Sequence, residues 1–518
     1  MATFSLNGKQ VDAPDGMNLI EAAKLNGVDI PHYCYHPGLS IAGNCRMCLC
    51  EIEGARGPQI ACASNVKEGM VVRTDTPAVE KMRKGVQEFL LLNHPIDCPI
   101  CDQAGECRLQ DYYMEYGKYD NRSDVAKVQK LKAVDLGPMV VLDQERCILC
   151  TRCVRFCEEI SKTNELCVSG RGDTSVITTF PGKNLDNPYS GNVVDVCPVG
   201  ALTSKDFRFK MRVWFMKSVK SLCTGCANGC NTFLDQKDAV AYRYRPRENK
   251  QVNDYWMCDG GRLSYKAIND GRQENVLLGG QTATFERAVT VFAEAIASAA
   301  GSVAVVGSPT SSVEDLFTLQ AFAQKVLKTE SVYGYSPIPD GDADDFLIRA
   351  DKTPNRTGVR YLGYNTDKQA LLDGLRGVKL AIVSNNNLAQ DSELAAALKQ
   401  VPTVVYLTTH LDETAALAQV VLPLASHAEK YGSFINYAGR LQRFYMAFAP
   451  QGDALSEMEF FSTLGHRLDR AFGYGDIEEV WKDLRGRFAE LGELTWYGLG
   501  DEGFQLPSLA RQPAAAGQ

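Results

Sequence analysis

The stretch "CILCTRCVRFC", residues 147–157, places four cysteines at short intervals, and Cys197-Pro198 follows forty residues after the last of them. The chain has 18 cysteines, all between Cys34 and Cys258, so that the last 260 residues contain none. A secreted disulfide protein would not leave half of its length without cysteine, and the N-terminus lacks the basic and apolar regions of a signal peptide. The cysteines are therefore predicted to be metal or cluster ligands in a reducing compartment.

The spacing C-x2-C-x2-C-x3-C with a remote Cys-Pro is that of bacterial ferredoxins and is highly specific for a [4Fe–4S] cluster. In that pattern the first three cysteines share a cluster with the Cys-Pro, and the fourth serves a second cluster. A second cluster needs four ligands, and only Cys157 and Cys167 remain nearby. We therefore predict one cluster here and structural roles for these two thiols. The predicted ligands are Cys147, Cys150, Cys153 and Cys197.

Nearer the N-terminus, four cysteines lie around a glycine-bearing loop of a small α+β domain, in which a hairpin is predicted at Asn7-Gly8 and a helix from Asn18 to Gly27. Such a loop suits a [2Fe–2S] cluster, because thiolates hold iron and flexible backbone lets N–H groups point at the sulfides. Zinc is the alternative, but zinc sites favour paired CxxC motifs and only one occurs here. Cys50 lies outside the pattern and is predicted to be a buried small apolar residue. The predicted ligands are Cys34, Cys45, Cys48 and Cys62.

The stretch "HPIDCPICDQAGEC", residues 94–107, follows a helix predicted from about Pro77 by its apolar spacing. Three cysteines and a histidine are a standard structural zinc set, so zinc and iron both remain open for this motif taken alone. A histidine on an iron–sulfur cluster is less common, and it should raise the reduction potential, as in Rieske centres. The candidate ligands are His94, Cys98, Cys101 and Cys107.

A last group of cysteines has the spacing C-x2-C-x3-C-x27-C and is followed by "DGGR". Two short gaps and one long gap are specific for a metal site. Zinc ribbons prefer two CxxC pairs, so a [4Fe–4S] cluster is favoured here too. The predicted ligands are Cys223, Cys226, Cys230 and Cys258.

Composition limits the class of protein. With 518 residues, 45% hydrophobic and 23% charged, the chain is predicted to be a soluble globular protein of several domains. A net charge of −8 argues against binding nucleic acid, which needs a basic surface. No run approaches the roughly 18 apolar residues that span a bilayer. We therefore expect a cytoplasmic protein that reaches a membrane only as part of a complex.

The cysteine-free half alternates strands and helices, which predicts a parallel α/β sheet. In "GSVAVVGSPTSSVEDLFTLQAFAQKVL" we expect a buried strand at Val303–Val306, a capping box formed by Ser311 and Glu314, and an amphipathic helix. Neither GxGxxG nor a Walker motif follows any of these strands, so nucleotide binding has no support from motifs.

In this order, the four cysteine sets resemble the family of large iron–sulfur subunits of NADH:quinone oxidoreductase (respiratory complex I). The likeness lies in "HPIDCPICDQAGECRLQD", "DQERCILCTRCVRFCEEI", "SGNVVDVCPVGALTSKDFRFKMR" and the Cys223–Cys258 set. It implies one [2Fe–2S] cluster and three [4Fe–4S] clusters, held by the four sets named above. The cluster of the last set occurs in only some members of the family.

Beyond residue 272 the chain is similar, less specifically, to the molybdopterin oxidoreductase fold, through "VVGSPTSSVEDLFTLQAFA" and "AQVVLPLASHAEKYGSFINYAGRLQRF". The catalytic enzymes of that fold typically have a lysine after the last cluster cysteine, whereas Asp259-Gly260-Gly261 stand here. This half also offers no cysteine to ligate molybdenum. A structural domain without molybdenum is therefore expected.

Together these features predict a multidomain protein of the α/β plus α+β class. The expected domains are a β-grasp [2Fe–2S] ferredoxin domain (1–77), the one-histidine, three-cysteine [4Fe–4S] domain (78–118), a ferredoxin-like [4Fe–4S] domain (119–216), a four-cysteine [4Fe–4S] domain of molybdopterin-oxidoreductase type (217–273), a degenerate molybdopterin-oxidoreductase-like parallel α/β domain (274–509) and a disordered tail (510–518).

The resemblance implies an electron relay on the cytoplasmic face of the inner membrane, in the peripheral arm of the complex. Implied partners are the NADH- and FMN-binding flavoprotein subunit, its small [2Fe–2S] partner and the quinone-side iron–sulfur subunits. One alternative is a cluster-bearing or catalytic subunit of a soluble NAD-linked formate dehydrogenase or hydrogenase, against which the missing molybdenum features argue. A zinc-holding assembly scaffold is the other alternative.

Overall fold

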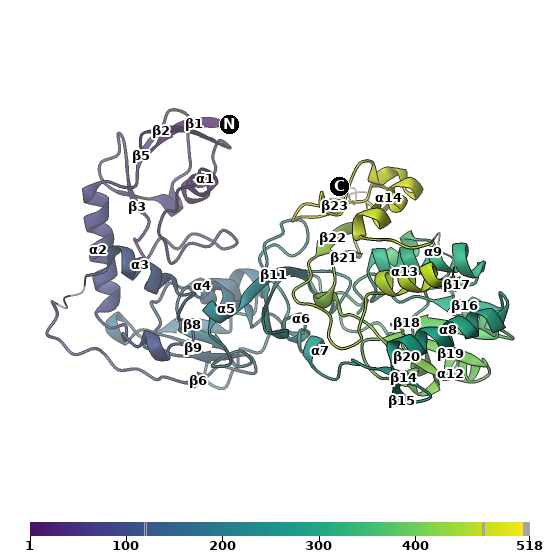
Figure 1. Cartoon of the computed structure of the whole chain (residues 1–518). Helices are drawn as coiled ribbons and strands as arrows, with labels where there is room; N and C mark the ends of the chain where they lie inside the picture. The colour runs from purple at the N-terminus through teal and green to yellow at the C-terminus, as the bar shows by residue number, and fades with distance from the viewer. Residues whose placement is uncertain (119, 121, 469–471, 511–518) are drawn as a thin grey trace, which may run out of the picture. The chain divides into compact units, whose positions relative to one another are not determined.

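The computed structural model describes residues 1–118, 120, 122–468 and 472–510. It divides into two compact units, Met1–Met216 and Lys217–Gln518, which Figure 1 shows in purple to blue and in teal to yellow. Of the tail that was expected to be disordered, only Ala510 is among the described residues, so that expectation stays a prediction. Among the described residues, no helix combines the length and the apolar character needed to cross a membrane.

The first unit begins with a five-stranded sheet in the order β2-β1-β5-β3-β4, with helix α1 packed against it. The predicted hairpin is confirmed: Asn7 and Gly8 both have positive φ, as a two-residue turn between twisted strands requires. The helix predicted from Asn18 is confirmed as well, and Asn18 caps it: its Oδ1 accepts a hydrogen bond from the Ile20 amide at 3.0 Å. The elements are β1 (Ala2–Leu6), β2 (Lys9–Ala13), α1 (Leu19–Leu25), β3 (Leu49–Ile52), β4 (Gln59–Ile60) and β5 (Val71–Arg73).

Two helices follow, α2 (Pro77–Leu91) and α3 (Arg108–Tyr116), and α2 confirms the helix that was predicted from Pro77. Gln87 lies buried between them and joins them to the first cysteine loop. Its side chain accepts a hydrogen bond from the Tyr33 hydroxyl at 2.7 Å and donates one to the Leu109 carbonyl at 3.2 Å. The loop between the two helices carries the histidine-containing motif.

The rest of the first unit holds the ferredoxin-type cysteines between short elements. A three-stranded sheet in the order β10-β7-β6 and a hairpin of β8 and β9 surround helices α4 and α5, and α4 continues as a π-helical turn. The elements are β6 (Val134–Asp135), β7 (Val140–Leu142), α4 (Arg152–Arg155), the π-helical turn (Phe156–Ile160), β8 (Leu166–Ser169), β9 (Val176–Thr179), α5 (Asn192–Val196) and β10 (Leu202–Ser204).

The second unit begins with an antiparallel three-stranded sheet, and the last cysteine set flanks its strands. A second small antiparallel sheet is formed by segments from near the C-terminus, in the order β21-β22-β23. The elements are β11 (Lys217–Leu222), β12 (Asn231–Lys237), β13 (Val240–Pro246), α6 (Asp259–Leu263), α7 (Lys266–Asn269), β21 (Gly432–Ile435), β22 (Arg440–Phe444) and β23 (Phe504–Gln505).

The main sheet of this unit has seven strands in the order β15-β14-β20-β19-β18-β16-β17, and the five from β20 to β17 are parallel, as predicted. Alternate residues of a strand point to opposite faces of the sheet and so belong to different hydrophobic cores. In β16, Val303 and Val305 pack with α8, α9 and α13, whereas Ala304 and Val306 pack with α11 and α12. The elements are β14 (Val276–Leu278), β15 (Gln281–Ala283), α8 (Phe285–Ala299), β16 (Val303–Val306), α9 (Val313–Phe322), β17 (Val332–Tyr333), α10 (Arg356–Tyr361), α11 (Lys368–Leu375), β18 (Leu380–Ser384), α12 (Ser392–Leu398), β19 (Thr403–Thr408), β20 (Val420–Pro423), α13 (Glu457–Leu468) and α14 (Ile477–Arg487).

Two details of the predicted strand–helix unit are wrong. The helix cap is Ser312, whose hydroxyl accepts from the Asp315 amide at 3.1 Å, and not Ser311. Glu314 instead accepts hydrogen bonds from Ser433 and Trp481, so its carboxylate serves tertiary structure. Helix α9 is also not amphipathic, because all ten of its residues are buried.

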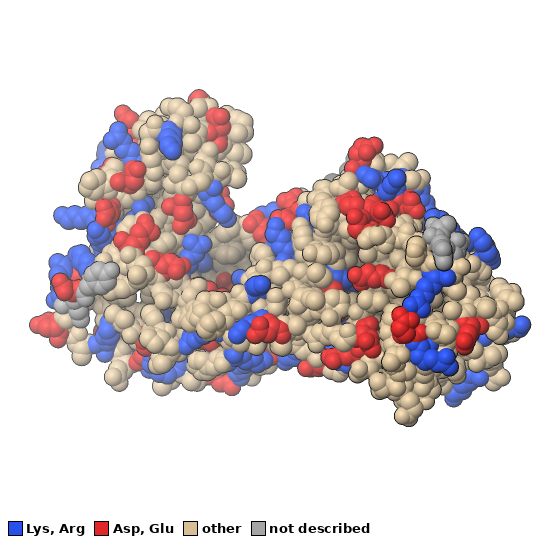
Figure 2. Space-filling view, in the orientation of Figure 1, with Lys and Arg blue, Asp and Glu red and all other residues tan. Residues whose placement is uncertain are grey.

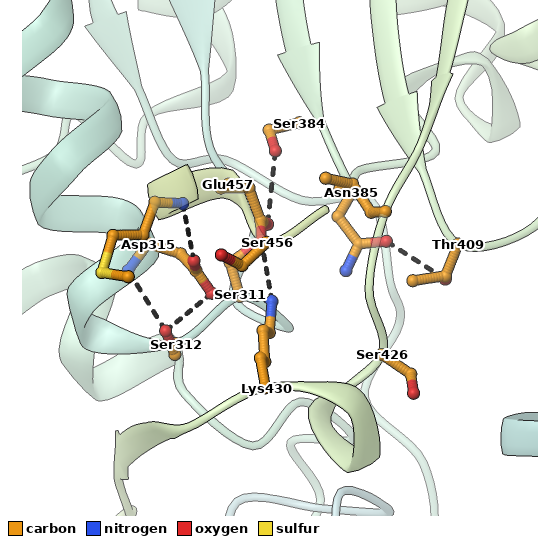
Figure 3. A network of polar contacts seen from close by, with 12 residues as sticks. Ser311, Ser312, Asp315, Ser384, Asn385, Thr409, Ser426, Lys430, Ser456 and Glu457 are labelled. Atoms are coloured by element: carbon orange, nitrogen blue, oxygen red, sulfur yellow. Dashed lines mark hydrogen bonds and ion pairs between the residues drawn. The ribbon is translucent and has the colours of Figure 1, made fainter. Parts of the chain in front are cut away.

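A buried ion triad anchors α9 to its neighbours (Figure 3). Lys430 Nζ lies 2.7 Å from a carboxylate oxygen of Asp315 and 2.7 Å from one of Glu457. Ser311 and Ser384 donate hydrogen bonds to the other Glu457 oxygen, at 2.6 and 3.3 Å. Burial disfavours ionisation of Asp315, but the Lys430 charge holds its pKa below the ordinary value. The triad therefore joins the carboxyl ends of β16 and β18 to α9 and α13.

Candidate iron–sulfur centres

The first cysteine set is gathered between α1, β3 and the segment after β4. Cys34 shares a hydrogen bond with Cys45, and Cys48 shares one with Cys62. The bond from Cys45 lowers the pKa of Cys34 to about 5, whereas the bond to Cys48 and burial raise the pKa of Cys62. The Cys34 amide also donates to the Cys45 sulfur at 3.5 Å. Four buried or half-buried sulfurs with backbone N–H groups beside them fit a thiolate-held cluster. Cys50 packs in the apolar core of this domain.

The second set lines a single cavity of about 200 Å³, into which His94, Cys98, Cys101 and Cys107 all face. His94 Nδ1 is buried there and has no hydrogen-bond partner. Burial lowers the pKa of His94 to about 4, so the imidazole is neutral at pH 7 and keeps a lone pair. A buried imidazole nitrogen without a partner, in a pocket lined by three thiols, fits a metal or cluster ligand.

Gly200 belongs to the same cavity, although spacing within the motif gave no indication of it. A Cβ atom at this position would overlap the Cys101 sulfur, so only glycine leaves room for that thiol. Gly200 lies three residues after Cys197 in "CPVGAL". This closeness to the Cys-Pro was the signal in the sequence that could have identified Gly200. The loop of the third set thus touches a ligand of the second.

The third set also lines one cavity, with Cys147, Cys150, Cys153 and Cys197 around it and Leu142, Ile177 and Val199 among the apolar neighbours. Leu149 and Thr151 have positive φ, and the Leu149 amide donates to the Cys147 sulfur at 3.4 Å. Burial raises the pKa of Cys147 to about 12 and that of Cys150 to about 11. These thiols are therefore protonated at pH 7 until a metal binds and displaces the protons.

Cys157 and Cys167 are not among the residues that line this cavity. Cys157 is fully buried in the π-helical turn, where burial raises its pKa to about 12. Cys167 lies exposed on strand β8 and its sulfur is 3.6 Å from the Thr178 carbonyl oxygen. Their assignment as thiols without a cluster stays a prediction.

The fourth set is surrounded by hydrogen-bond donors and a close glycine. The Gly225 amide donates to Cys223 at 3.4 Å, the Gly261 amide to Cys258 at 3.2 Å, and the Asn228 side chain to Cys230 at 3.1 Å. A Cβ at Gly261 would lie 2.9 Å from the Cys223 sulfur and 3.2 Å from that of Cys258. Cysteine spacing alone did not identify Asn228 and Gly261, which the structure adds as functional candidates. For Gly261 the sequence offered a signal, because it lies in the "DGGR" that follows Cys258. Hydrogen bonds to sulfur are one of the means by which a protein tunes a cluster.

Among the described residues, no three or more His, Cys, Asp and Glu side chains are arranged as the ligands of a metal ion. The four sets fit iron–sulfur clusters by their chemistry: thiols buried together, backbone amides aimed at sulfur, glycines against sulfur and one unpartnered imidazole nitrogen.

Four family models match the chain. Residues 1–77 match a 2Fe-2S iron-sulfur cluster binding domain, and residues 83–122 the NADH-ubiquinone oxidoreductase-G iron-sulfur binding region. Residues 137–203 match the ferredoxin-like domain of NADH-quinone oxidoreductase subunit 3. Residues 216–270 match the molybdopterin oxidoreductase Fe4S4 domain. The chain thus carries domains of the [2Fe–2S] and [4Fe–4S] types.

Curated relatives extend the likeness beyond single domains. The G subunit of NADH-quinone oxidoreductase from Rickettsia conorii is 41% identical over 332 residues, which are 63% of this chain and 49% of that protein. The mitochondrial NADH dehydrogenase [ubiquinone] iron-sulfur protein 1 of Solanum tuberosum is 44% identical over 54% of this chain and 38% of its own length. The 78 kDa subunit of Neurospora crassa NADH-ubiquinone oxidoreductase is 39% identical over 65% of this chain and 47% of its own.

The matched stretch of this chain spans about half the length of the first of these relatives. Among solved structures, a chain of an NAD+-reducing [NiFe]-hydrogenase in the H2-reduced state matches with 29% identity and a TM-score of 0.36, over 41% of this chain and 91% of that one. By sequence, the cysteine-rich half of the chain is a relative of the G subunit of NADH-quinone oxidoreductase and of the corresponding mitochondrial iron–sulfur subunits of 75–78 kDa.

Proposed function

We propose that the chain is an electron-transfer subunit of an NADH:quinone oxidoreductase, with one [2Fe–2S] cluster and three [4Fe–4S] clusters on the four ligand sets. When bound, each cluster supplies one-electron transfer without proton chemistry of its own. The proposed partners are an NADH- and FMN-binding flavoprotein subunit with its small [2Fe–2S] partner on the input side, and quinone-side iron–sulfur subunits on the output side.

One observation carries this proposal: in the first unit, the loops that hold the ligand sets are hydrogen-bonded to or packed against one another. Arg155 donates hydrogen bonds to the carbonyls of Cys34 and Cys150, at 2.6 and 3.3 Å, and so joins the first set to the third. Gly200 lies against Cys101 and so joins the third set to the second. The proposed order along the relay, which the family resemblance implies, is the Cys34 set, the Cys147 set and then the His94 set.

The side chains of the second set have distinct tasks in such a relay. Cys101 and Cys107 are buried in a mainly apolar cavity, which reduces the screening of the charge of a bound cluster. The neutral His94 imidazole replaces one negative thiolate, which makes the reduced state less costly here than at the all-cysteine sites. The second set is thus suited to accept electrons at the end of the series.

The fourth set and the cysteine-free half are proposed to be structural, without molybdenum. In open α/β sheets, ligands bind at the carboxyl ends of the parallel strands, where the strand order reverses. In this sheet that position lies between β16 and β18, and the Lys430 triad stands beside it, with one lysine bonded to two buried carboxylates. What supports the proposal is that charged side chains of the chain itself bind one another beside this position.

The proposed location is the cytoplasmic face of the inner membrane, within a peripheral arm, with membrane contact only through the complex. No nucleic-acid partner is proposed. On the face that Figure 2 shows, acidic and basic side chains are interspersed, and the net charge of the chain is −8. A surface of mixed sign suits protein partners better than a phosphate backbone.

The test is metal analysis of the full chain purified without oxygen, combined with electron paramagnetic resonance (EPR) of the reduced protein. We expect about 14 irons per chain, two in a [2Fe–2S] cluster and four in each of three [4Fe–4S] clusters, and no molybdenum. Co-purification with a flavoprotein and with membrane subunits would support the proposed partners. A colourless protein with several zinc ions would contradict the proposal, and stoichiometric molybdenum would favour a catalytic formate dehydrogenase type of subunit.

A further inference from the structure

Helix α4 carries two buried arginines, one on each side of Cys153 in the third set. Arg152 is 9% exposed and Arg155 is 7% exposed. Arg155 reaches the loop of the first set, where its guanidinium donates to the carbonyls of Cys34, at 2.6 Å, and of Ser40. Arg152 donates to the Tyr35 carbonyl in the same loop and to the Val196 carbonyl, at 3.2 Å, next to Cys197. Both guanidinium groups therefore lie between the first and the third ligand sets.

Neither guanidinium has a carboxylate counter-ion within the part of the chain that the structure describes: their hydrogen bonds go to carbonyl and hydroxyl oxygens. The acidic groups that face Arg152 electrostatically are the thiols of Cys34, Cys150 and Cys197, with Arg108 as an opposing cation. Arg152 Nε is buried without a hydrogen-bond partner. Burying a cation that is paired only with neutral oxygens costs free energy, and a nearby negative charge would offset that cost.

Thiolate-held clusters supply that charge. All four ligands of each set lose their protons on binding, and the cluster with its thiolates is anionic. Reduction adds one more negative charge, which a fixed cation at short range in a buried site favours. An arginine that lies against both ligand loops should therefore affect the reduction potentials of both clusters. Its several N–H donors also hold the two loops at a fixed distance from one another.

We propose that Arg152 and Arg155 are shared counter-ions and positioning residues for the [2Fe–2S] cluster of the Cys34 set and the [4Fe–4S] cluster of the Cys147 set. They raise the reduction potential of both clusters and hold the two ligand loops together. This inference rests on the proposed function, because it needs both clusters to be present. Each cluster takes up a single electron, and no bond or proton moves.

The experiment is an anaerobic redox titration of the full chain with dithionite, followed by EPR, in the wild type, Arg155→Gln and Arg155→Lys. For Arg155→Gln we expect the reduction equilibrium of both clusters to become at least tenfold less favourable, about 59 mV for a one-electron couple. The His94 cluster should shift less, because Arg155 does not contact its ligands. Arg155→Lys keeps the charge and should recover most of the potential shift, although it loses the fork that contacts both loops.

Arg171→Gln is the matched control. Arg171 lies exposed at the turn between β8 and β9, so this variant also removes one positive charge, but one that solvent screens from the clusters. It should leave all potentials unchanged. Unchanged potentials of both clusters in Arg155→Gln, with full iron content, would overturn the counter-ion role and leave the proposed function intact. Absence of iron from the wild type would instead contradict the proposed function.

If Arg155→Gln does not retain its iron, Arg152→Gln is titrated instead, with the same expected fall in both potentials. If both glutamine variants lose the two clusters selectively and Arg155→Lys and Arg152→Lys keep them, the requirement for positive charge is supported. If the lysine variants lose these clusters as well, charge is not the decisive property of the two arginines, and the proposal is wrong.

Discussion

At the scale of single residues, Gly200 gives the sharpest prediction. A methyl group at this position would overlap the Cys101 sulfur, and the neighbouring Gln103 and Arg146 leave it little space. Gly200→Ala should therefore displace Cys101 and remove one cluster, about four irons per chain, while the other three clusters remain. Iron analysis and EPR measure this outcome. Gly85→Ala is the control: it lies in α2 with nothing near its Cβ, so iron content should stay the same and the helix gain up to about 1 kcal/mol.

His94 gives a second prediction at this scale. His94→Cys supplies a fourth thiolate in place of a neutral imidazole, so the cluster should persist with a lower reduction potential, by on the order of 100 mV. A redox titration followed by EPR measures the shift. An unchanged potential with intact iron content would show that His94 is not a ligand and that its buried, unpartnered nitrogen has another cause.

Cysteine spacing was enough to select residues of the second and third sets that share a cavity, because most members of each set are close in sequence and restricted to few residue types. Their role as ligands stays a prediction. The residues around them could not be predicted in this way. Gly200 matters through contact with Cys101, ninety-nine positions earlier, and Arg155 through contact with Cys34, 121 positions earlier. Such contacts depend on how separate loops pack together, and no local pattern records them.

At the scale of elements, the Lys430 triad gives a test of how α9 and α13 are held. Lys430→Met would leave the Asp315 and Glu457 carboxylates buried without their cation, which typically costs about 3–5 kcal/mol. The thermal unfolding transition of the second unit should therefore move to clearly lower temperature. Calorimetry of the full chain measures this shift.

Lys368→Met is the matched control, since Lys368 pairs with Asp391 and Glu393 at the surface. Exposed ion pairs add little stability, so its transition should barely move. Equal shifts for the two variants would contradict the account of the triad as a buried structural anchor.

The same region shows where prediction of elements succeeded and failed. The strand Val303–Val306 was predicted correctly, because four consecutive apolar residues before a glycine indicate a buried parallel strand. The helix cap was assigned one residue too early, because Ser311 and Ser312 both fit the capping pattern. The choice between them depends on Glu314. Its carboxylate accepts hydrogen bonds from Ser433 and Trp481, more than a hundred positions away, and therefore does not take part in a capping box.

At the scale of the whole molecule, the proposed function divides the chain into a relay and a scaffold. The three ligand sets whose loops contact one another all lie within Met1–Met216, and the fourth lies in the unit that begins at Lys217. The loop of the fourth set is bound into its own unit: the Ala227 amide donates to the Asp351 carbonyl, and Arg349 donates to Asn228 at 3.3 Å. A cluster held in this way would stabilise the packing of its unit, which is the structural role that we propose for it.

This division leads to a prediction about Cys226, a ligand of the fourth set. Cys226→Ala should lose about four irons per chain and lower the unfolding temperature of the second unit, because a structural cluster contributes its binding energy to folding. Reduction of the other three clusters, and electron flow from NADH to quinone in the assembled complex, should persist. Cys153→Ala is the comparison: it removes a ligand from the middle of the series, so electron flow should stop. Loss of electron flow in a Cys226→Ala protein that still folds and assembles would place the fourth cluster on the electron path and overturn its structural assignment.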